Sequence, residues 1–513
     1  MKYLSLFLSL LLALVSGCAI NPVTGERELG LVGEQQEIAI GTEQYEPGRQ
    51  MEGGDYLLDP QLNAYVNEIG QKLARVSDRP LPYEFRVLNN SVPNAWALPG
   101  GKISINRGLL LELNNEAELA AVLSHEIVHS AARHGAQRME KGMLMQGALL
   151  ATSVAVSDSS YGGIAVGGAQ LAANIITQKY GREAELESDY YGMRYMSRAG
   201  YDPKSAISLQ HTFVRLSGDK KNNWLNGLFA SHPPSMERVE KNKLTAQSLK
   251  PGGETGESRY QEKIRYIKKT APAYMAYDDG VLALKKGDNR KALALADEAM
   301  KIEPREALFP SLQSEAFFQQ GNYRQALDSS NRALGLNNRF FQFYIQRGLI
   351  REKLGDMPGA KQDLEHSTKL LPTANAYKKL GDMSLTSGRS ADAKGFFQKA
   401  ASSQSQVGKD AYISFLRLDL PENPAKYLRL RAEQEKDGTM RLLLSNPTPL
   451  PVHGIQCVIR FTDAQGATGQ ISVTHKGTVE PGKNVTISLD GQKTPAKYQH
   501  TLEAKIIAAK IPQ

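Results

Sequence analysis

Residues 125–129 read His-Glu-Ile-Val-His, a run with two histidines four residues apart. The hydrophobic pattern around it predicts a helix from about residue 115 to about residue 138. Histidines four residues apart lie one turn apart on the same helix face, so His125 and His129 can bind one zinc ion. Glu126 is offset by about 100° and can act as a general base on a water molecule at the metal. A helix with two incidental histidines is the alternative.

A catalytic zinc ion needs a third protein ligand. His134 is close in sequence, but a continuous helix would turn it about 180° away from His125. Position 135 is Gly, so a third His six residues after His129 is absent, which argues against the metzincin class of peptidases. The third ligand is therefore expected from another segment.

A second predicted helix offers acidic candidates for this ligand. Glu185 and Asp189 are four residues apart, so Glu185 can bind the metal while Asp189 orients a ligand histidine. Glu183 and Glu187 are alternative ligands. A solvated acidic helix face without any metal is a further interpretation.

Residues 1–17 have the pattern of a secretory signal peptide, with a positive charge at Lys2 and an apolar stretch over Leu4–Val15. This stretch is too short for a stable transmembrane span. It leads into Val-Ser-Gly-Cys, which resembles a bacterial lipobox, so Cys18 is predicted to be lipidated and to anchor the mature chain. Ala19 follows in place of an Asp that would retain the protein in the inner membrane, so the periplasmic side of the outer membrane is expected. An ordinary signal peptide with a chance Cys is the alternative.

The bulk composition indicates several domains and excludes some functions. A chain of 513 residues exceeds one compact core, and three or four domains are expected. The net charge of +8 is modest, and no dense Lys/Arg run with interleaved aromatic residues occurs, so no nucleic-acid partner is predicted. The chain has two cysteines, and lipidation of Cys18 would leave Cys457 without a disulfide partner.

Four glycines mark an internal repeat, because Gly287, Gly321, Gly355 and Gly388 are spaced by 34, 34 and 33 residues. An Ala stands five residues after each Gly, and an Ala or Ser stands twelve residues after each. A period near 34 with Gly at a turn and small residues at helix contacts is typical of tetratricopeptide (TPR) repeats. Such repeats form an α-helical solenoid with a concave binding surface. Generic helical hairpins are the alternative.

After about residue 436 the hydrophobic pattern changes to period two, which predicts a small β-sandwich. Its predicted strands are Met440–Leu444, Ile455–Phe461, Gln470–Thr474, Asn484–Leu489 and Thr501–Ile507.

The chain is thus predicted to be mainly α and multidomain. The predicted segments are a lipoprotein signal peptide (1–17), a zinc metallopeptidase domain (18–250), a linker (251–272), TPR repeats (273–405), a helical connector (406–435) and a β-sandwich-like domain (436–513). Residues 142–176 are rich in Gly, Ala and Met and nearly uncharged. They are predicted to form either a buried helical pair or a loop that covers the cleft or touches a membrane.

Residues 19 to about 245 resemble the HtpX-like gluzincin peptidases, a family that includes the CAAX prenyl endopeptidases. The resemblance rests on five segments: Asn21-Pro22-Val23-Thr24-Gly25 with Glu34-Gln35-Gln36-Glu37 after it, Asn94 to Gly101, the run at 125–129 with His134 after it, Glu185 with Asp189, and Ser231-His232-Pro233 with Arg238.

The resemblance implies that His125, His129 and Glu185 bind one Zn²⁺ per subunit and that Glu126 is the base. It also implies that Asp189 supports a ligand histidine. A cleft edge, where an extended substrate can pair with an exposed strand, is implied for Asn94, Ala95, Trp96 and Ala97.

Two further residues have weaker implied roles. In such peptidases a loop histidine can approach the metal as a plug or as a transition-state donor, and His232 is the matching residue here. A loop histidine without function is the alternative. Arg238 is expected to steady nearby carboxylates or to be a solvated helix residue.

The expected activity is that of a zinc metalloendopeptidase of the bacterial periplasm and outer membrane. Its expected substrates are misfolded or stalled envelope proteins, with an additional chaperone-like role. The repeats would recruit unfolded or misassembled envelope proteins, or bind the outer-membrane assembly machinery. The alternative is a TPR scaffold or chaperone whose metal site is silent or gated by His232.

Overall fold

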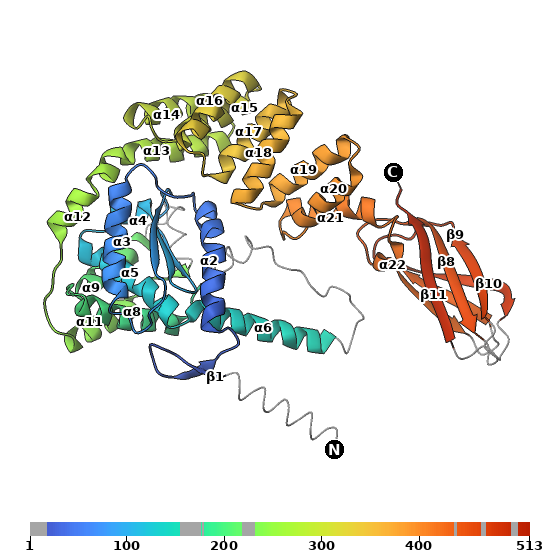
Figure 1. Ribbon diagram of the computed structural model, residues 1–513, viewed down its shortest axis with the longest axis horizontal. Coiled ribbons are helices and arrows are strands. Elements are labelled where there is room, and N and C mark those ends of the chain that lie inside the picture. The colour runs from blue at the N-terminus through green and yellow to red at the C-terminus, as the bar shows by residue number, and fades with distance from the viewer. Residues whose placement is uncertain are drawn as a thin grey trace, which may run out of the picture. The chain divides into compact units, whose positions relative to one another are not determined.

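Figure 1 shows the fold of the chain in a computed structural model. The residues that the structure describes are 18–153, 176, 179–217, 231–434, 439–462, 468–493 and 501–512. The predicted signal peptide, and the predicted 142–176 segment from residue 154 on apart from Ile176, lie outside the described residues. The chain divides into two compact units, Met1–Pro372 and Thr373–Gln513. This division falls inside the predicted repeat region.

The first unit begins with a hairpin and a three-stranded sheet. Its first elements are β1 (Cys18–Ile20), β2 (Arg27–Leu29), α2 (Glu34–Met51), α3 (Pro60–Ala74), β3 (Glu84–Leu88), β4 (Ala95–Leu98), β5 (Lys102–Asn106) and α4 (Arg107–Glu112). The sheet has the order β3-β5-β4, with β3 parallel and β4 antiparallel to β5.

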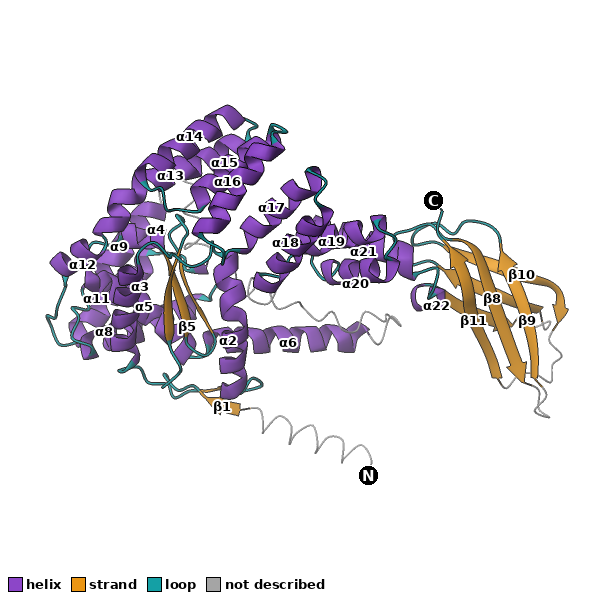
Figure 2. Cartoon of the chain, turned by 45° about the horizontal axis from the view of Figure 1, so that its top comes forward, coloured by secondary structure: helices purple, strands orange, loops and turns teal. Residues whose placement is uncertain are grey.

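The helices that carry the candidate site follow: α5 (Glu116–Ala131), α6 (His134–Ser153), α8 (Arg182–Arg198), α9 (Ser205–Ser217) and α11 (Met236–Ser248). Asn115 caps α5, since its side chain accepts a hydrogen bond from the backbone N–H of Glu118. Every residue of α5 is buried, because β4, α8 and α9 pack around it. Figure 2 shows the sheet between α2 on one side and α3 with α5 on the other.

The predicted continuation of this helix to about residue 138 is wrong. Helix α5 ends at Ala131, and Arg133 adopts a left-handed conformation with φ 62° before α6 begins. Such a conformation costs about 1–2 kcal/mol for a residue with a side chain. Buried partners offset this cost: the Arg133 guanidinium donates to Glu37 at 2.6 Å, Glu28 at 2.5 Å and Glu140 at 3.1 Å.

The segment predicted as a linker is helical from Glu257 onward, with α12 (Glu257–Lys263) followed directly by α13 (Arg265–Lys285). Tyr260 of α12 is fully buried, and its hydroxyl donates to the carbonyl of Leu110 at 2.6 Å. One hydrophobic cluster contains Tyr260 together with residues of α3, α5 and the first repeats. In the first unit, the repeats therefore share the core of the preceding domain.

Pairs of helices follow at the predicted period. In the first unit these are α13 with α14 (Asn289–Ile302), α15 (Leu308–Gln319) with α16 (Tyr323–Leu336), and α17 (Phe341–Lys353) with α18 (Met357–Leu370). The second unit begins with a further pair, α19 (Ala374–Thr386) and α20 (Ser390–Ala400). The four predicted glycines lie at the turns inside the pairs, each with a positive φ between 75° and 84°.

The remainder of the second unit consists of α21 (Gln406–Asp419), α22 (Pro424–Tyr427), β6 (Arg429–Gln434), β7 (Thr439–Ser445), β8 (His453–Thr462), β9 (Thr468–His475), β10 (Asn484–Lys493) and β11 (Thr501–Lys510). The strands form two three-stranded antiparallel sheets, β10-β7-β6 and β11-β8-β9, whose apolar residues share one cluster. All five predicted strands are present. Strand β6 was not predicted and lies in the segment expected to be a helical connector.

Within the described ranges, no helix has both the length and the apolar content that crossing a bilayer requires.

Candidate metal centre

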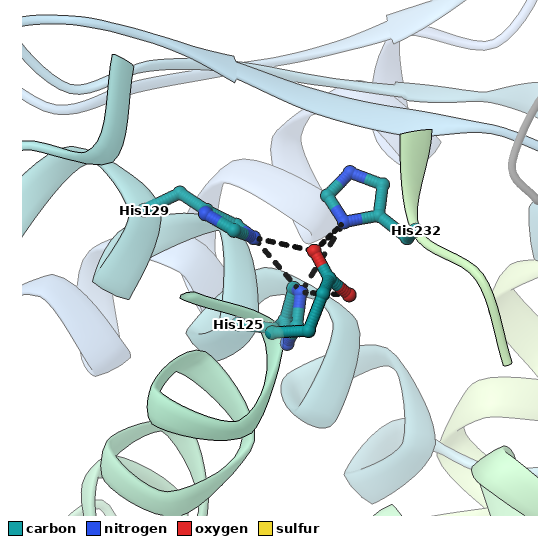
Figure 3. A group of neighbouring side chains, drawn as sticks. His125, His129 and His232 are labelled. Carbon is teal, nitrogen blue, oxygen red and sulfur yellow. Dashed lines mark hydrogen bonds and ion pairs between the residues drawn. The ribbon is translucent and has the colours of Figure 1, made fainter. Parts of the chain in front are cut away.

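Three histidines and one glutamate from three segments of the chain lie close together at the C-terminal half of α5. His125 and His129 come from α5, Glu185 comes from α8, and His232 lies shortly before α11. One nitrogen or oxygen atom of each residue lies within 4.8 Å of the others, and all four residues are at most 9% exposed. Figure 3 shows the three imidazole rings turned towards one another.

The separations between these atoms match the geometry of a single zinc ion. Zinc–nitrogen bonds of about 2.0–2.1 Å in a tetrahedron place neighbouring ligand atoms about 3.3 Å apart. Nε2 of His125 and Nε2 of His129 are 3.0 Å apart, and they lie 3.6 Å and 3.4 Å from the Glu185 carboxylate. Nδ1 of His232 lies 2.9 Å from Glu185 and 3.4 Å from Nε2 of His125. The donor set therefore fits Zn²⁺.

A buried arginine and a buried aspartate hold these residues from behind. Asp189 accepts from Nδ1 of His125 at 3.0 Å, which directs Nε2 of that ring towards the other donors. The guanidinium of Arg238 binds both carboxylate oxygens of Asp189 at 2.7 Å and lies 2.7 Å from Glu185. Gly192 allows α8 to approach α5, because an added Cβ would lie 3.2 Å from the backbone nitrogen of His125.

His134 is also part of this centre, and the prediction that it faces away is wrong. The left-handed turn at Arg133 brings Nδ1 of His134 to 2.8 Å from Nδ1 of His129. Nε2 of His134 lies 3.3 Å from Glu187. These contacts favour one arrangement, in which His129 donates to His134 and His134 donates to Glu187. His134 thus lies behind a histidine of the group, and Glu187 contacts His134 instead of the cluster.

Residues 60–245 match the model of peptidase family M48. They form a peptidase family M48 domain. The M48 domain contains all four clustered residues, and the family is zinc-dependent. The family resemblance inferred from the sequence is confirmed.

Two relatives are each similar to about a third of the chain. A putative beta-barrel assembly-enhancing protease of Vibrio cholerae is 33% identical over 187 residues, covering 35% of this chain and 36% of the relative. The mitochondrial metalloendopeptidase OMA1 of Arabidopsis thaliana is 30% identical over 168 residues, covering 33% of this chain and 32% of the relative. The chain spans about a third of the length of these relatives. Among solved structures, the first TPR of Spaghetti (RPAP3), bound to an HSP90 peptide, covers 23% of this chain and 98% of its own, at 24% identity and a TM-score of 0.23.

Glu126 lies at the edge of the group, in the position next to His125. Its Oε1 is 3.6 Å from Nε2 of His232, and its buried Oε2 has no hydrogen-bond partner among the described residues. Burial raises the pKa of Glu126, although His232 and His125 partly counteract this. A carboxyl group with a raised pKa and one unpaired oxygen, beside a set of candidate metal ligands, is suited to accept a proton from water.

The pKa values of three more buried residues at the metal centre are shifted by burial and by neighbouring charges. Burial acts to raise the pKa of Glu185, but His232, Arg238 and His125 outweigh it and hold the pKa well below its usual range. Burial acts likewise on Asp189, and Arg238 keeps its pKa low. Burial lowers the pKa of His129 well below its usual value, which favours the neutral, metal-binding imidazole.

The predicted cleft edge is covered in this structure. Residues 95–98 form β4, an edge strand of the sheet, with Asn94 just before it. Residues 94–98 are all at most 5% exposed, and Ile176 packs in the same cluster as Trp96. The expectation of an exposed strand is therefore not met in this conformation.

Sequence reasoning missed one aromatic residue at the centre. The ring of Tyr180 stacks on His129 with a centroid separation of 3.8 Å and lies 5.3 Å from His232. Burial raises the pKa of its hydroxyl to about 12. A single Tyr in a polar segment carries no local signal for such a role.

Proposed function

We propose that the chain is a zinc-dependent endopeptidase in which His125, His129 and Glu185 hold the ion and Glu126 is the general base. One observation carries this proposal: within an M48 domain, the four donor atoms lie within 4.8 Å of one another, and Oε2 of Glu126 beside them has no hydrogen-bond partner among the described residues. A bound zinc ion supplies Lewis acidity that polarises a peptide carbonyl and acidifies water.

Other side chains of the site transfer the proton and orient the metal ligands. Glu126 accepts a proton from the attacking water and delivers it to the departing amine. Asp189 and His134 keep the rings of His125 and His129 in one tautomer and orientation, and Arg238 fixes Asp189 together with the ligand carboxylate. Pre-set orientation of this kind limits the reorganisation needed during the reaction.

With a zinc ion bound, His232 would fill the position that a catalytic zinc site keeps free. Structural zinc sites have four protein ligands, whereas catalytic sites use three and leave the fourth position to water or substrate. With His232 2.9 Å from Glu185 and 3.6 Å from Glu126, the group is closed. The active form therefore requires His232 to withdraw, after which its imidazole can donate to the substrate carbonyl. This closure also favours a second candidate function, a repeat scaffold or chaperone with a gated metal site.

The cellular role proposed here is removal of misfolded or stalled proteins of the bacterial envelope. The predicted lipobox at Cys18, the helical repeats, and the relative named as a beta-barrel assembly-enhancing protease support it. In this role Cys18 anchors the chain at the periplasmic side of the outer membrane. The repeats bind unfolded substrates or the outer-membrane assembly machinery, with a chaperone-like contribution.

The substitution Glu126→Gln tests the activity. The variant should keep about one zinc per chain by metal analysis, because Glu126 is outside the proposed ligand set. Cleavage of an unfolded protein should fall by about 10²–10⁴-fold through loss of the base. Glu183→Gln, which changes an exposed carboxylate on α8, is the matched control and should cleave normally. Undiminished cleavage by Glu126→Gln would contradict the mechanism, and a zinc-loaded parent that only suppresses aggregation would favour the scaffold.

A further inference from the structure

Four large apolar side chains are exposed around one corner of the first unit. The exposed fractions are 67% for Ile20, 45% for Leu31, 49% for Met143 and 53% for Leu144. A single exposed apolar residue is ordinary, but several on adjoining elements mark an interaction surface. These four residues are called the apolar patch below.

Hydrogen bonds place the elements of the apolar patch side by side. The backbone N–H of Val32 donates to Glu140 at 2.9 Å, so Leu31 lies next to the first turns of α6. Met143 and Leu144 follow one turn after Glu140 on the same side of that helix. The hairpin is tied to the same helix, because Gln137 donates to Glu28 at 2.5 Å. Figures 1 and 2 both show β1 beside the start of α6.

Each end of the apolar patch has a basic neighbour. Arg27 is the cross-strand partner of Ile20 in the hairpin, so both side chains lie on one hairpin face. Lys141 precedes Leu144 by one turn and is exposed. Both basic residues line a second cavity, whose acidic residues are Glu26, Glu28, Glu183 and Glu187. Of these, Glu28 is bound by Arg133, and Glu187 contacts His134.

We propose that the apolar patch docks on the surface of a lipid bilayer, with Arg27 and Lys141 at the headgroups. This inference rests on the envelope location in the proposed function. Apolar side chains flanked by basic ones are typical of segments that lie in the membrane interface. The position of Ile20 favours lipid over a protein partner, because it is two residues, about 7 Å of extended chain, from the predicted acylation site at Cys18.

Docking would fix the metal centre relative to the bilayer. The side chain of Asn21, next to Ile20, donates to the carbonyl of Ala132 at 3.0 Å. Ala132 lies just past the end of α5, three residues after His129. The apolar patch is thus connected through one hydrogen bond to the helix that carries two of the proposed zinc ligands.

Vesicle sedimentation tests the docking without the acyl anchor. The predicted signal peptide ends before Cys18, so the mature chain from that residue on, carrying Cys18→Ser, serves as the parent. It is mixed with vesicles of phosphatidylethanolamine and phosphatidylglycerol, and separately with phosphatidylcholine vesicles. We expect binding to the anionic vesicles that falls at least about tenfold in the double variant Ile20→Ser, Leu144→Gln, and weaker binding to phosphatidylcholine.

The control carries Met275→Gln and Leu282→Gln on α13, which are 67% and 51% exposed and lie in the repeats. It should bind vesicles like the parent. Equal loss in the patch and control variants, no binding by the parent, or a change of oligomeric state in the patch variant would each overturn the proposal. Zinc content and cleavage of a soluble unfolded substrate, measured on the parent and on the patch variant, should be equal. A failure of the peptidase mechanism would therefore be seen separately from a failure of docking.

Discussion

Each α5 histidine in the metal centre has a distinct partner on the ring nitrogen that faces away from the other donors. His125 is held by Asp189 at 3.0 Å, while His129 is held at 2.8 Å by a second imidazole, that of His134. A carboxylate partner strengthens the donor nitrogen of its ring more than an imidazole does. His129 is therefore the weaker of the two donors and depends more on correct orientation.

Replacing His134 by Ala should weaken zinc binding by about 10–100-fold, because His129 would lose its only described ring partner on Nδ1. Competition against a chelator measures this affinity. His211→Ala, which removes an exposed histidine of α9, is the control and should bind zinc like the parent. Unchanged affinity in the His134 variant would show that orientation of His129 does not depend on this contact.

The sequence could predict the residues whose relation depends on helical spacing alone. His125, His129 and the Glu185/Asp189 pair were all found in this way, and the structure brings them together. His134 was misplaced because the break at Arg133 depends largely on residues far away in the sequence. It depends on Glu37 and Glu28, which lie about 100 residues earlier in the chain.

At the level of single elements, the second unit contains a carboxylate that ties three helices together. Asp419 at the end of α21 contacts Lys394 of α20, and Lys426 and Tyr427 of α22. Burial acts to raise the pKa of Asp419, but hydrogen bonds from Tyr427, Lys394 and Lys426 lower it to about 2. A carboxylate whose pKa is lower in the folded than in the unfolded chain stabilises the fold above the unfolded pKa.

The stability supplied by Asp419 should be present above about pH 4 and lost as the pH falls towards 2. At pH 7, Asp419→Asn should lower the free energy of unfolding of this unit by about 1–2 kcal/mol, a value reduced by solvent around the lysines. At pH 2 the difference should be small. Urea unfolding of both proteins at the two pH values measures it, and a difference that does not shrink at low pH would contradict the assignment.

The sequence could predict those helices and strands whose residue pattern repeats at a regular spacing. The turn glycines and small contact residues gave four helix pairs, and Ala292, Ala326, Ala360 and Ala393 are fully buried, as the repeat requires. Strand β6 was missed because Arg429–Gln434 reads Arg-Leu-Arg-Ala-Glu-Gln, which has helix-forming residues. Pairing with β7 decides its conformation instead.

For the first unit as a whole, a buried polar network joins the M48 domain to the repeats. Glu306, between α14 and α15, accepts hydrogen bonds from Asn89 at 3.0 Å and from Tyr274 at 2.5 Å. The guanidinium of Arg107 lies 3.4 Å from the centre of the Tyr274 ring. Because these side chains are buried, they lock the first repeats to the domain that holds the metal centre.

Replacing Glu306 by Ala should lower the free energy of unfolding of the first unit by about 1–3 kcal/mol, because Asn89 and Tyr274 would lose buried partners. Zinc release and the helical signal of the first unit should still change together on unfolding, since one hydrophobic cluster spans both parts. Glu315→Ala is the control, as this residue lies on α15 and makes only peripheral contacts. Two separate transitions in the parent would show that the repeats unfold independently.

The left-handed turn at Arg133 also has a consequence for the order in which the protein matures. Its partners Glu28 and Glu37 lie about 100 residues earlier in the chain, and they complete the turn only when both regions meet. Contacts over such sequence distances form late in folding. His134 reaches His129 only after this step, so a growing or unfolded chain lacks the finished metal centre. The peptidase would thus acquire full zinc affinity as one of the last events of its own folding.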